Sequence, residues 1–447
     1  MTTLTEKLQT LLYRLGVGGY HLLIRAAAVF GVGQARKWVD GRKKQDLKAL
    51  NKALLKDPTL HPRPRPKDSA GFRLIWMHCA SLGEFEQGRP VLEALRRTHP
   101  HWRVLLTFFS PSGYERCRHT ETADQVAYLP PDGPGNAERW LAAVRPDVAI
   151  FVKYEFWFFH LRALNRAGIP TFLVAGSFRP GQLFFRSGGD WWRRMLGYFT
   201  AIAVQTEKDL ALLTGPGNVP EDQVVVTGDP RMDRTLQLAE QPFEDEKLEG
   251  FTRGAATVVI AGSVWPADVD LWKKVFPELP AACRLVLAPH QLHEKEISGW
   301  VNDFAAVRYS TAATEEVISA RVLILDTIGV LSRVYRYGDL AYVGGAFKTG
   351  LHNTLEPMAY GLPVVFGPHH QKFPEAAEAM RRGGAFSIRS AGELSKQLFH
   401  LFDVSNARRA SQAQLTLAAL NGGAGSRTAA EIVDRLTFAA KSAEDDL

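Results

Sequence analysis

Short apolar runs alternate with longer amphipathic stretches along much of the chain. The runs are four to seven residues long and apolar almost throughout, which is typical of parallel strands covered on both faces of a sheet. The longer stretches, such as 84–98 and 156–167, repeat apolar residues at helical spacing. In the first half of the chain the predicted strands are 73–79, 103–109, 147–153, 171–175, 201–205 and 223–227.

The same pattern starts again after a polar, acidic stretch at 237–254. Two successive βαβ blocks predict two doubly wound, Rossmann-like domains of the α/β class, facing each other across a cleft. We place the domains at 67–236 and 237–447, and the last helix is a candidate to return to the first domain. In the second block the predicted strands are 257–262, 284–288, 321–325, 340–344 and 363–366, and helices are predicted at 328–337 and 373–382.

The N-terminal segment, 1–66, has a different pattern. Residues 8–30 are apolar but are interrupted by Arg14, His21 and Arg25, so the charge-free intervals hold ten residues each. A membrane span needs about 20. We expect a helix that lies in a membrane interface, and the alternative is a helix packed on the protein body. The proline-rich residues 56–70 predict a linker.

The net charge of +7 is concentrated at this end of the chain. Residues 1–67 carry fourteen Lys and Arg against four Asp and Glu, so the remaining residues have a net charge of −3. Basic residues beside an apolar stretch favour an anionic membrane surface over nucleic acid as the partner. Aromatic residues and arginines also alternate at 178–199, which suits a single-stranded nucleic acid, a lipid headgroup or a buried core. The three cysteines are far apart and form no disulfide or zinc pattern.

A first candidate motif runs from His78 to Glu84, directly after a predicted strand. Ligands of open α/β sheets bind at the carboxyl ends of the strands. Gly83 permits a tight turn, and Glu84 then opens a helix at this edge, where partial burial suits a carboxylate to act as a general base. The alternative is an ordinary acidic residue that stabilises the first turn of a helix.

A second candidate motif is a glycine-rich loop at 344–350, followed by His352 to Glu356. It leaves one strand and leads into a helix predicted to begin near Thr354. Glycines permit close approach of backbone N–H groups to a phosphate, and Glu356 is placed to accept hydrogen bonds from ribose hydroxyls. We interpret the loop as a nucleotide site. The alternative is a glycine-rich turn with an ordinary helix cap.

Asp268 and Asp270 form a D-x-D pair like the metal-binding pair of single-domain glycosyltransferases. Here the pair follows Pro266 at the start of a predicted helix. First-turn acids are therefore the favoured interpretation, and we expect neither a metal ion nor any other cofactor.

Taken together, the motifs resemble those of the 3-deoxy-D-manno-octulosonate (Kdo) transferase family of Gram-negative bacteria. The resemblance extends over nearly the whole chain. It rests on the H-x-x-S-x-G-E string at 78–84, Tyr342 to Gly345, the H-N-x-L-E string at 352–356 and Gly367-Pro368-His369. The N-terminal segment adds Trp38 and the triplet Gly41-Arg42-Lys43.

The resemblance implies a GT-B fold and transfer of Kdo from CMP-Kdo to the lipid A precursor lipid IVA, with inversion, at the cytoplasmic face of the inner membrane. It implies that Glu84 is the general base and that Glu155 and Arg231 stabilise the transition state. The residues on the family's CMP contacts are Pro289, His290, Ile328, Gly329, Val330, Asn353, Thr354, Leu355 and Glu356.

The chain departs from the family pattern at several of these positions. Arg231 stands where the family often has Lys, His290 where it often has Arg, and Val330 where it often has Glu. Phe158 and Phe159 replace a Pro-Asn pair after Trp157. A histidine makes a phosphate contact dependent on pH, and valine offers no carboxylate. Two alternatives stay open: another GT-B sugar-nucleotide enzyme, such as a UDP-sugar transferase or epimerase, and a non-catalytic membrane-binding module.

Overall fold

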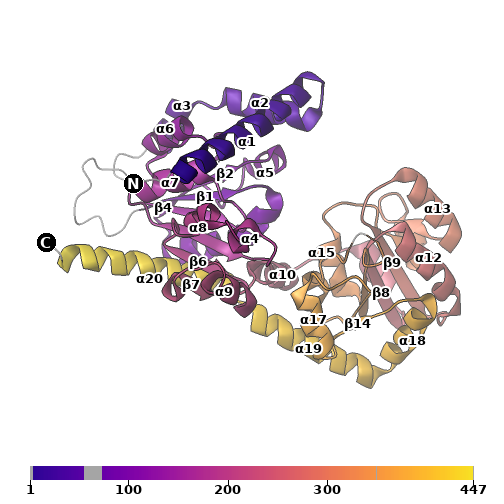
Figure 1. The fold of residues 1–447 in the computed structure, drawn as a ribbon. Coiled ribbons are helices and arrows are strands. Elements are labelled where there is room, and N and C mark those ends of the chain that lie inside the picture. The colour runs from indigo at the N-terminus through magenta and orange to yellow at the C-terminus, as the bar shows by residue number, and fades with distance from the viewer. Residues whose placement is uncertain (1–3, 55–72, 349, 446–447) are drawn as a thin grey trace. The chain divides into compact units, whose positions relative to one another are not determined.

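The computed structural model describes residues 4–348 and 350–445, apart from 55–72 (Figure 1). The chain forms two compact units. Unit 1 contains the described residues up to Arg231 and those from Gly423 onward, and unit 2 contains Met232–Gly422. The division falls inside helix α10 (Pro230–Glu240), a few residues before the expected boundary at 236/237. The predicted linker at 56–70 lies outside the described residues.

Unit 1 is built on a parallel seven-stranded sheet with the order β3-β2-β1-β4-β5-β6-β7. The order reverses between β1 and β4, which makes this pair the topological switch point, where α/β sheets bind ligands. The short edge strand β3 was not predicted, because only four residues of ordinary composition form it. The strands are β1 (Leu74–Cys79), β2 (Arg103–Phe108), β3 (Gln125–Tyr128), β4 (Val148–Val152), β5 (Thr171–Gly176), β6 (Ala201–Val204) and β7 (Val224–Val226).

Every residue of β1 and β4 is buried, because helices cover both faces of this sheet. Trp76 packs on one face with Trp140 and Phe151, while Ile75 and Met77 pack on the other. The last helix, α20, packs beside α4 in unit 1. The helices are α4 (Leu82–Thr98), α5 (Pro111–Cys117), α6 (Pro134–Val144), α7 (Phe158–Arg166), α8 (Asp190–Leu196), α9 (Glu207–Thr214) and α20 (Ala424–Asp445).

Unit 2 repeats the design with the strand order β10-β11-β9-β8-β12-β13-β14, so its switch point lies between β8 and β12. The strands are β8 (Thr257–Val264), β9 (Cys283–Pro289), β10 (Val307–Arg308), β11 (Val322–Ile324), β12 (Leu340–Val343), β13 (Val364–Phe366) and β14 (Ala385–Ser387). The helices are α11 (Glu246–Thr252), α12 (Pro266–Val275), α13 (Glu294–Phe304), α14 (Thr314–Ser319), α15 (Leu331–Val334), α16 (Leu355–Ala359), α17 (Pro374–Arg381), α18 (Ala391–Phe402) and α19 (Val404–Asn421).

Three N-terminal helices, α1 (Leu4–Val29), α2 (Gly33–Lys44) and α3 (Leu47–Leu54), pack on unit 1 (Figure 1). The hydroxyl of Tyr13 donates a hydrogen bond of 2.8 Å to the buried carboxylate of Asp132. The guanidinium of Arg42 donates to the carbonyls of Leu129 and Phe109. The segment is therefore part of the body of unit 1, although it also exposes apolar side chains. No single described helix has the length and hydropathy of a membrane span, and α1 and α2 reach that level only as a pair bent by 111°.

Candidate active site

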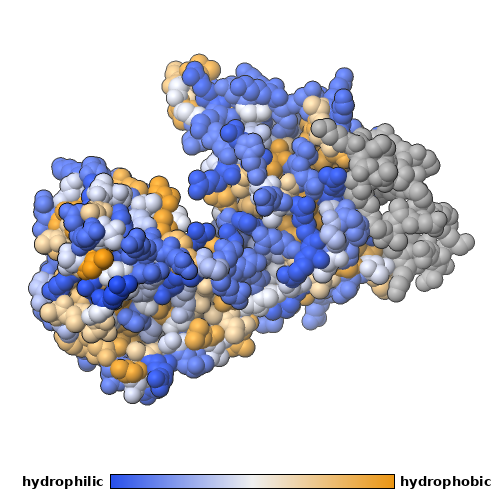
Figure 2. All heavy atoms as spheres, turned by 180° about the vertical axis from the view of Figure 1, so that it is seen from behind, coloured by the Kyte–Doolittle hydropathy of each residue, from blue (hydrophilic) through white to orange (hydrophobic). Residues whose placement is uncertain are grey.

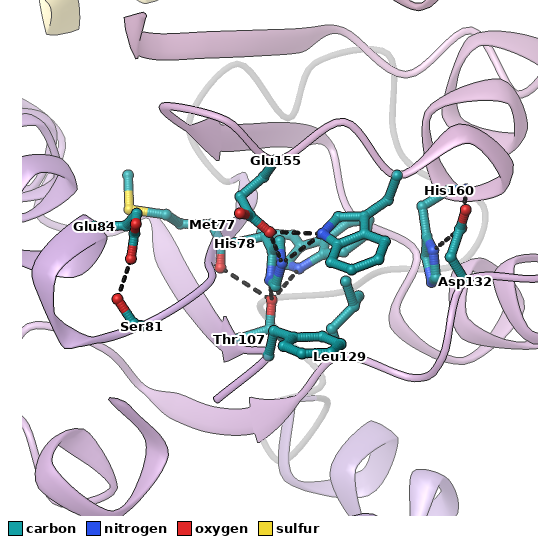
Figure 3. Close-up of polar contacts among 12 residues, drawn as sticks. Met77, His78, Ser81, Glu84, Thr107, Leu129, Asp132, Glu155 and His160 are labelled. Carbon is teal, nitrogen blue, oxygen red and sulfur yellow. Dashed lines mark hydrogen bonds and ion pairs between the residues drawn. The ribbon is translucent and has the colours of Figure 1, made fainter. Parts of the chain in front are cut away.

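The first motif lies at the switch point of unit 1, where β1 leads into α4 (Figure 3). Ser81 is the N-cap of α4, and its hydroxyl donates to the carboxylate of Glu84. Within the described residues, that carboxylate accepts no hydrogen bond from a backbone N–H, in contrast to Asp209, which completes a true capping box with Thr206. Glu84 is half-buried, and within the described residues its carboxylate makes no hydrogen bond besides that from Ser81. Glu84 also lies in the first turn of α4, as the alternative interpretation of an ordinary first-turn acid expects.

A buried polar network stands beside Glu84, around His78 (Figure 3). His78 Nε2 lies 3.1 Å from Glu155 Oε2, and the indole N–H of Trp157 donates to the same oxygen at 2.7 Å. On the other side of the ring, His78 Nδ1 lies 3.0 Å from Thr107 Oγ1. Burial lowers the pKa of His78, and the hydrogen bond with Glu155 acts in the opposite direction.

The network leaves one carboxylate oxygen of Glu155, Oε1, for a substrate. Its Oε2 is occupied by His78 and Trp157, and the residue is 8% exposed. The sequence analysis included His78 in the motif at 78–84 but assigned it no function. It did not predict that Thr107 or Trp157 belongs to the site. Their separation in sequence, 29 residues for His78 and Thr107 and 77 for His78 and Glu155, left no local signal.

Arg231 and Lys153 bring positive charge to the same edge of the sheet. The guanidinium of Arg231 pairs with the carboxylate of Asp229 through a hydrogen bond of 2.8 Å. Lys153 directly follows β4, on the other side of the switch point from Glu84. Burial lowers the pKa of Lys153, the charge of Arg231 lowers it further, and Asp229 and Glu84 raise it. Glu84 and Arg231 therefore each lie within electrostatic reach of Lys153, a residue that the sequence analysis missed.

The second motif lies at the switch point of unit 2. Gly344 follows β12, and a Cβ there would lie 2.5 Å from the carbonyl oxygen of Ser263 and 2.7 Å from Cα of Val264. Gly345 has a φ of +93°, a conformation that favours glycine. The glycines thus allow the loop from β12 to pass directly over the end of β8.

The helix after this loop begins where it was predicted, near Thr354: Thr354 is its N-cap and α16 starts at Leu355. With five residues, α16 has little dipole to offer a phosphate. The Asn353 side chain accepts from the N–H of Leu355 at 3.0 Å and donates to Glu356 Oε1 at 3.0 Å. Burial raises the pKa of Glu356, while the bond from Asn353 lowers it.

His290 lies in a stack of three rings. Its centroid is 4.7 Å from the Trp265 ring and 4.1 Å from the His352 ring, and the indole N–H of Trp265 donates to His352 Nε2 at 2.7 Å. Burial lowers the pKa of His290 and lowers that of His352 to about 4. Both rings are therefore neutral near pH 7. Burial therefore disfavours the imidazolium form of His290 in the absence of a ligand.

The other expected nucleotide contacts also follow strands at this edge of the sheet. Pro289 ends β9, while 328–330 form a loop after β11. The helix predicted at 328–337 begins only at Leu331, because Gly329 adopts a φ of +85°. Ile328 is consequently 81% exposed. A cavity of about 330 Å³ opens nearby, and Trp265, Asp268, His293, Phe347 and Lys348 are among the residues that line it.

Asp268 has a structural role in unit 2. Its buried carboxylate accepts from the N–H of Trp265 at 2.9 Å, the N–H of Gly345 at 3.0 Å and the hydroxyl of Tyr342 at 2.7 Å. Asp270 is exposed and pairs with Lys273. Nowhere in the described part of the chain do three His, Cys, Asp or Glu side chains converge as a metal site would require. Of the D-x-D pair, Asp268 thus has the structural role: its hydrogen bonds connect the start of α12 to the glycine-rich loop.

Comparison with solved structures identifies the architecture. A UDP-N-acetylglucosamine 2-epimerase matches with a TM-score of 0.61 and 14% identity, over 83% of this chain and 97% of that one. At this identity the likeness shows the fold alone. It confirms the predicted α/β class with two Rossmann-like units of the GT-B type.

Comparison with known sequences identifies the family. Residues 50–234 match the family described as 3-deoxy-D-manno-octulosonic-acid transferase (kdotransferase). The 3-deoxy-D-manno-octulosonic acid transferase of Aquifex aeolicus is 28% identical over 337 residues, which cover 74% of this chain and 86% of that protein. The transferase of Bordetella pertussis is 28% identical over 391 residues, covering 81% and 87%. Residues 50–234 therefore form a domain of the 3-deoxy-D-manno-octulosonic acid (Kdo) transferase family, and the chain is similar to glycosyltransferases of that name over most of its length.

Proposed function

We propose that this protein transfers Kdo from CMP-Kdo to lipid IVA in lipopolysaccharide core biosynthesis. The observation that carries the proposal is the position of Glu84. Its carboxylate lies at the switch point of unit 1, is half-buried and does not cap the helix backbone. A carboxylate held in this way, in a domain of the Kdo transferase family, has the position that a general base needs.

In the proposed reaction Glu84 removes the proton of the acceptor hydroxyl as that oxygen attacks the anomeric carbon of Kdo. The bond to the phosphate oxygen breaks on the opposite face, CMP leaves with the bonding electrons, and the anomeric centre is inverted. Positive charge develops on the sugar ring, so electrostatic stabilisation is the main requirement. Glu155 lies at the same sheet edge as Glu84, held by His78 and Trp157, and we assign its carboxylate to this stabilisation. Arg231 is assigned to the negative charge that develops on the leaving group.

The glycine-rich loop of unit 2 is the proposed site of the nucleotide. The N–H groups of Gly344, Gly345, Lys348 and Gly350 donate within the protein, so among the described loop residues Ala346 and Phe347 are the proposed donors to the single phosphate of CMP-Kdo. Asn353 to Glu356 follow directly. The neutral rings of His290 and His352 offer a flat surface and hydrogen bonds rather than charge. Arg231 is then the candidate, from the family resemblance, for the positive charge at the leaving group. We assign no metal ion or other cofactor to the reaction.

The N-terminal helices are the proposed membrane contact, at the cytoplasmic face of the inner membrane. Large apolar side chains on α1 and in the turn after it are exposed, and the tip of the α1–α2 pair shows as a hydrophobic patch in Figure 2. The exposed residues include Leu15, Leu22, Leu23, Phe30 and Val32. Arg36, Lys43 and Lys44 are exposed on α2, where they suit anionic headgroups. A lipid acceptor that stays in the bilayer requires such a contact.

Nucleotide selectivity separates this proposal from its nearest alternative. We expect CMP to raise the thermal unfolding temperature of the protein and UDP to leave it nearly unchanged at equal concentration. A larger shift with UDP would favour a UDP-sugar transferase or an epimerase, the activity named for the solved structure with the same fold. A non-catalytic membrane-binding module would bind vesicles without any nucleotide response.

A further inference from the structure

Lys153 occupies an unusual backbone position beside the proposed base. It directly follows β4 and has a φ of +66°, in the left-handed region that residues other than glycine rarely adopt. Its N–H still donates to the carbonyl of Val174 in β5 at 2.9 Å, so the sheet fixes this conformation. Lys153 is a long, charged residue at a position where glycine or asparagine would fit with less strain. Strain of this kind is characteristic of functional sites.

In the described part of the chain, the ammonium group of Lys153 forms no ion pair with a carboxylate and donates no hydrogen bond. Its Nζ sits 5.3 Å from the centre of the Tyr154 ring. The side chain is half-buried, and its burial lowers the pKa. A charge that is taken out of water without a partner loses solvation without compensation. An anion from a ligand would supply the missing partner.

The charges around Lys153 favour such an anion. Arg231 and Arg179 contribute positive charge at Lys153, while Asp229 is already engaged by Arg231. Glu84 is a second negative group that acts on Lys153, and it lies across the switch point, after the end of β1. An anionic group held at Lys153 would therefore place the rest of its molecule beside Glu84.

We propose that Lys153 is the centre of an anion subsite in unit 1, which binds a carboxylate or phosphate of a substrate next to the general base. This inference rests on the proposed function, in which two such groups exist: the carboxylate of Kdo on the donor and the phosphates of the acceptor. Both are anions that an ammonium group binds through charge-assisted hydrogen bonds. The subsite orients one substrate and leaves proton transfer to Glu84.

The decisive variant is Lys153→Gly, because glycine relieves the strain at φ +66° while it removes the charge. We expect an unfolding temperature equal to or above that of the wild type, together with a KM increased roughly tenfold or more, the cost of one charge-assisted hydrogen bond. Lys153→Arg should recover most of the loss. Lys208→Met, at an exposed position of α9, removes an equal charge and should match the wild type.

Two kinetic arms identify the source of the anion. If the acceptor supplies it, the acceptor KM rises in Lys153→Gly and the difference from wild type disappears on dephosphorylated acceptor. If the donor supplies it, the CMP-Kdo KM rises with either acceptor. Either result supports the subsite. Unchanged KM values for both substrates would overturn it, and so would a shift confined to the pH profile of kcat, which would mean that Lys153 acts only on Glu84.

A binding measurement separates this inference from the proposed function. Calorimetric titration of the full chain with inorganic phosphate and with free Kdo should show binding that weakens in Lys153→Gly and persists in Lys208→Met. If the wild type transfers no Kdo but this binding is found, the proposed function fails and the subsite stands. If the wild type transfers Kdo and both variants bind these anions like the wild type, the subsite is wrong and the function stands.

Discussion

Glu84→Gln removes the proton acceptor and keeps the size and hydrogen-bonding shape of the side chain. We expect kcat to fall at least about 100-fold, the usual contribution of a general base, while CMP affinity stays the same. Glu121→Gln, at an exposed position of unit 1, is the matched control and should be close to wild type. Near-normal turnover of Glu84→Gln would contradict the assignment.

His290 and His352 lead to a prediction about pH. Burial lowers the pKa of both rings, that of His352 to about 4, whereas the unfolded chain titrates near 6.5. The unfolded state therefore binds more protons between those values, and the contribution of these residues to stability is lost as the pH falls from about 6.5 towards 4. His352→Gln should show a smaller decrease in unfolding temperature over this range than the wild type. CMP affinity should be flat between pH 7 and 8, and a loss of affinity across this interval would indicate an imidazolium at the phosphate.

At the scale of elements, α2 packs the N-terminal helices against the body of unit 1. The guanidinium of Arg42 lies over the Trp38 ring at 3.8 Å and donates to the carbonyls of Leu129, at 3.0 Å, and Phe109, at 2.7 Å. A Cβ on Gly41 would lie 2.3 Å from the Tyr128 ring, so glycine permits this close packing. Deletion of residues 1–66 should therefore destabilise unit 1, contrary to the simple anchor hypothesis.

A pair of substitutions on this helix separates packing from charge. Arg42→Met leaves buried carbonyls without donors and should lower the stability of unit 1 by about 2–4 kcal/mol. Arg36→Met removes the same charge from an exposed position of α2 and should leave stability unchanged while it weakens vesicle binding slightly. Chemical denaturation monitored by tryptophan fluorescence measures the first effect. Equal stability of the two variants would show that α2 does not hold unit 1 together.

The exposed face of α1 gives a separate prediction about membrane binding. Replacing Leu15, Leu22 and Leu23 by serine should leave the fold intact, because these side chains are 62%, 66% and 70% exposed. Binding to anionic vesicles and turnover on vesicle-embedded acceptor should fall, while turnover on detergent-dispersed acceptor should fall less. Vesicle binding that matches the wild type would place the membrane contact elsewhere.

For the whole molecule, the sequence predicted most strands because both sheets are parallel and covered on both faces, which makes runs such as 148–152 apolar throughout. The strands β3, β10 and β14 were not predicted, because two to four residues at a sheet edge give no periodic pattern in the sequence. Glu84 and the glycine-rich loop were recognisable from local motifs. The bond between His78 and Glu155 and the three-ring stack depend on tertiary contacts between distant segments.

The central claim is that this chain transfers Kdo and that Glu84 is the base. The most direct test is mass spectrometry of the lipid product after the full chain is incubated with CMP-Kdo and lipid IVA in detergent, with the wild type and Glu84→Gln in parallel. We predict that the wild type yields lipid IVA heavier by whole Kdo residues, with release of CMP, and that the variant yields almost none at the same time. A wild-type product with no added Kdo, or equal product from both proteins, would contradict the account.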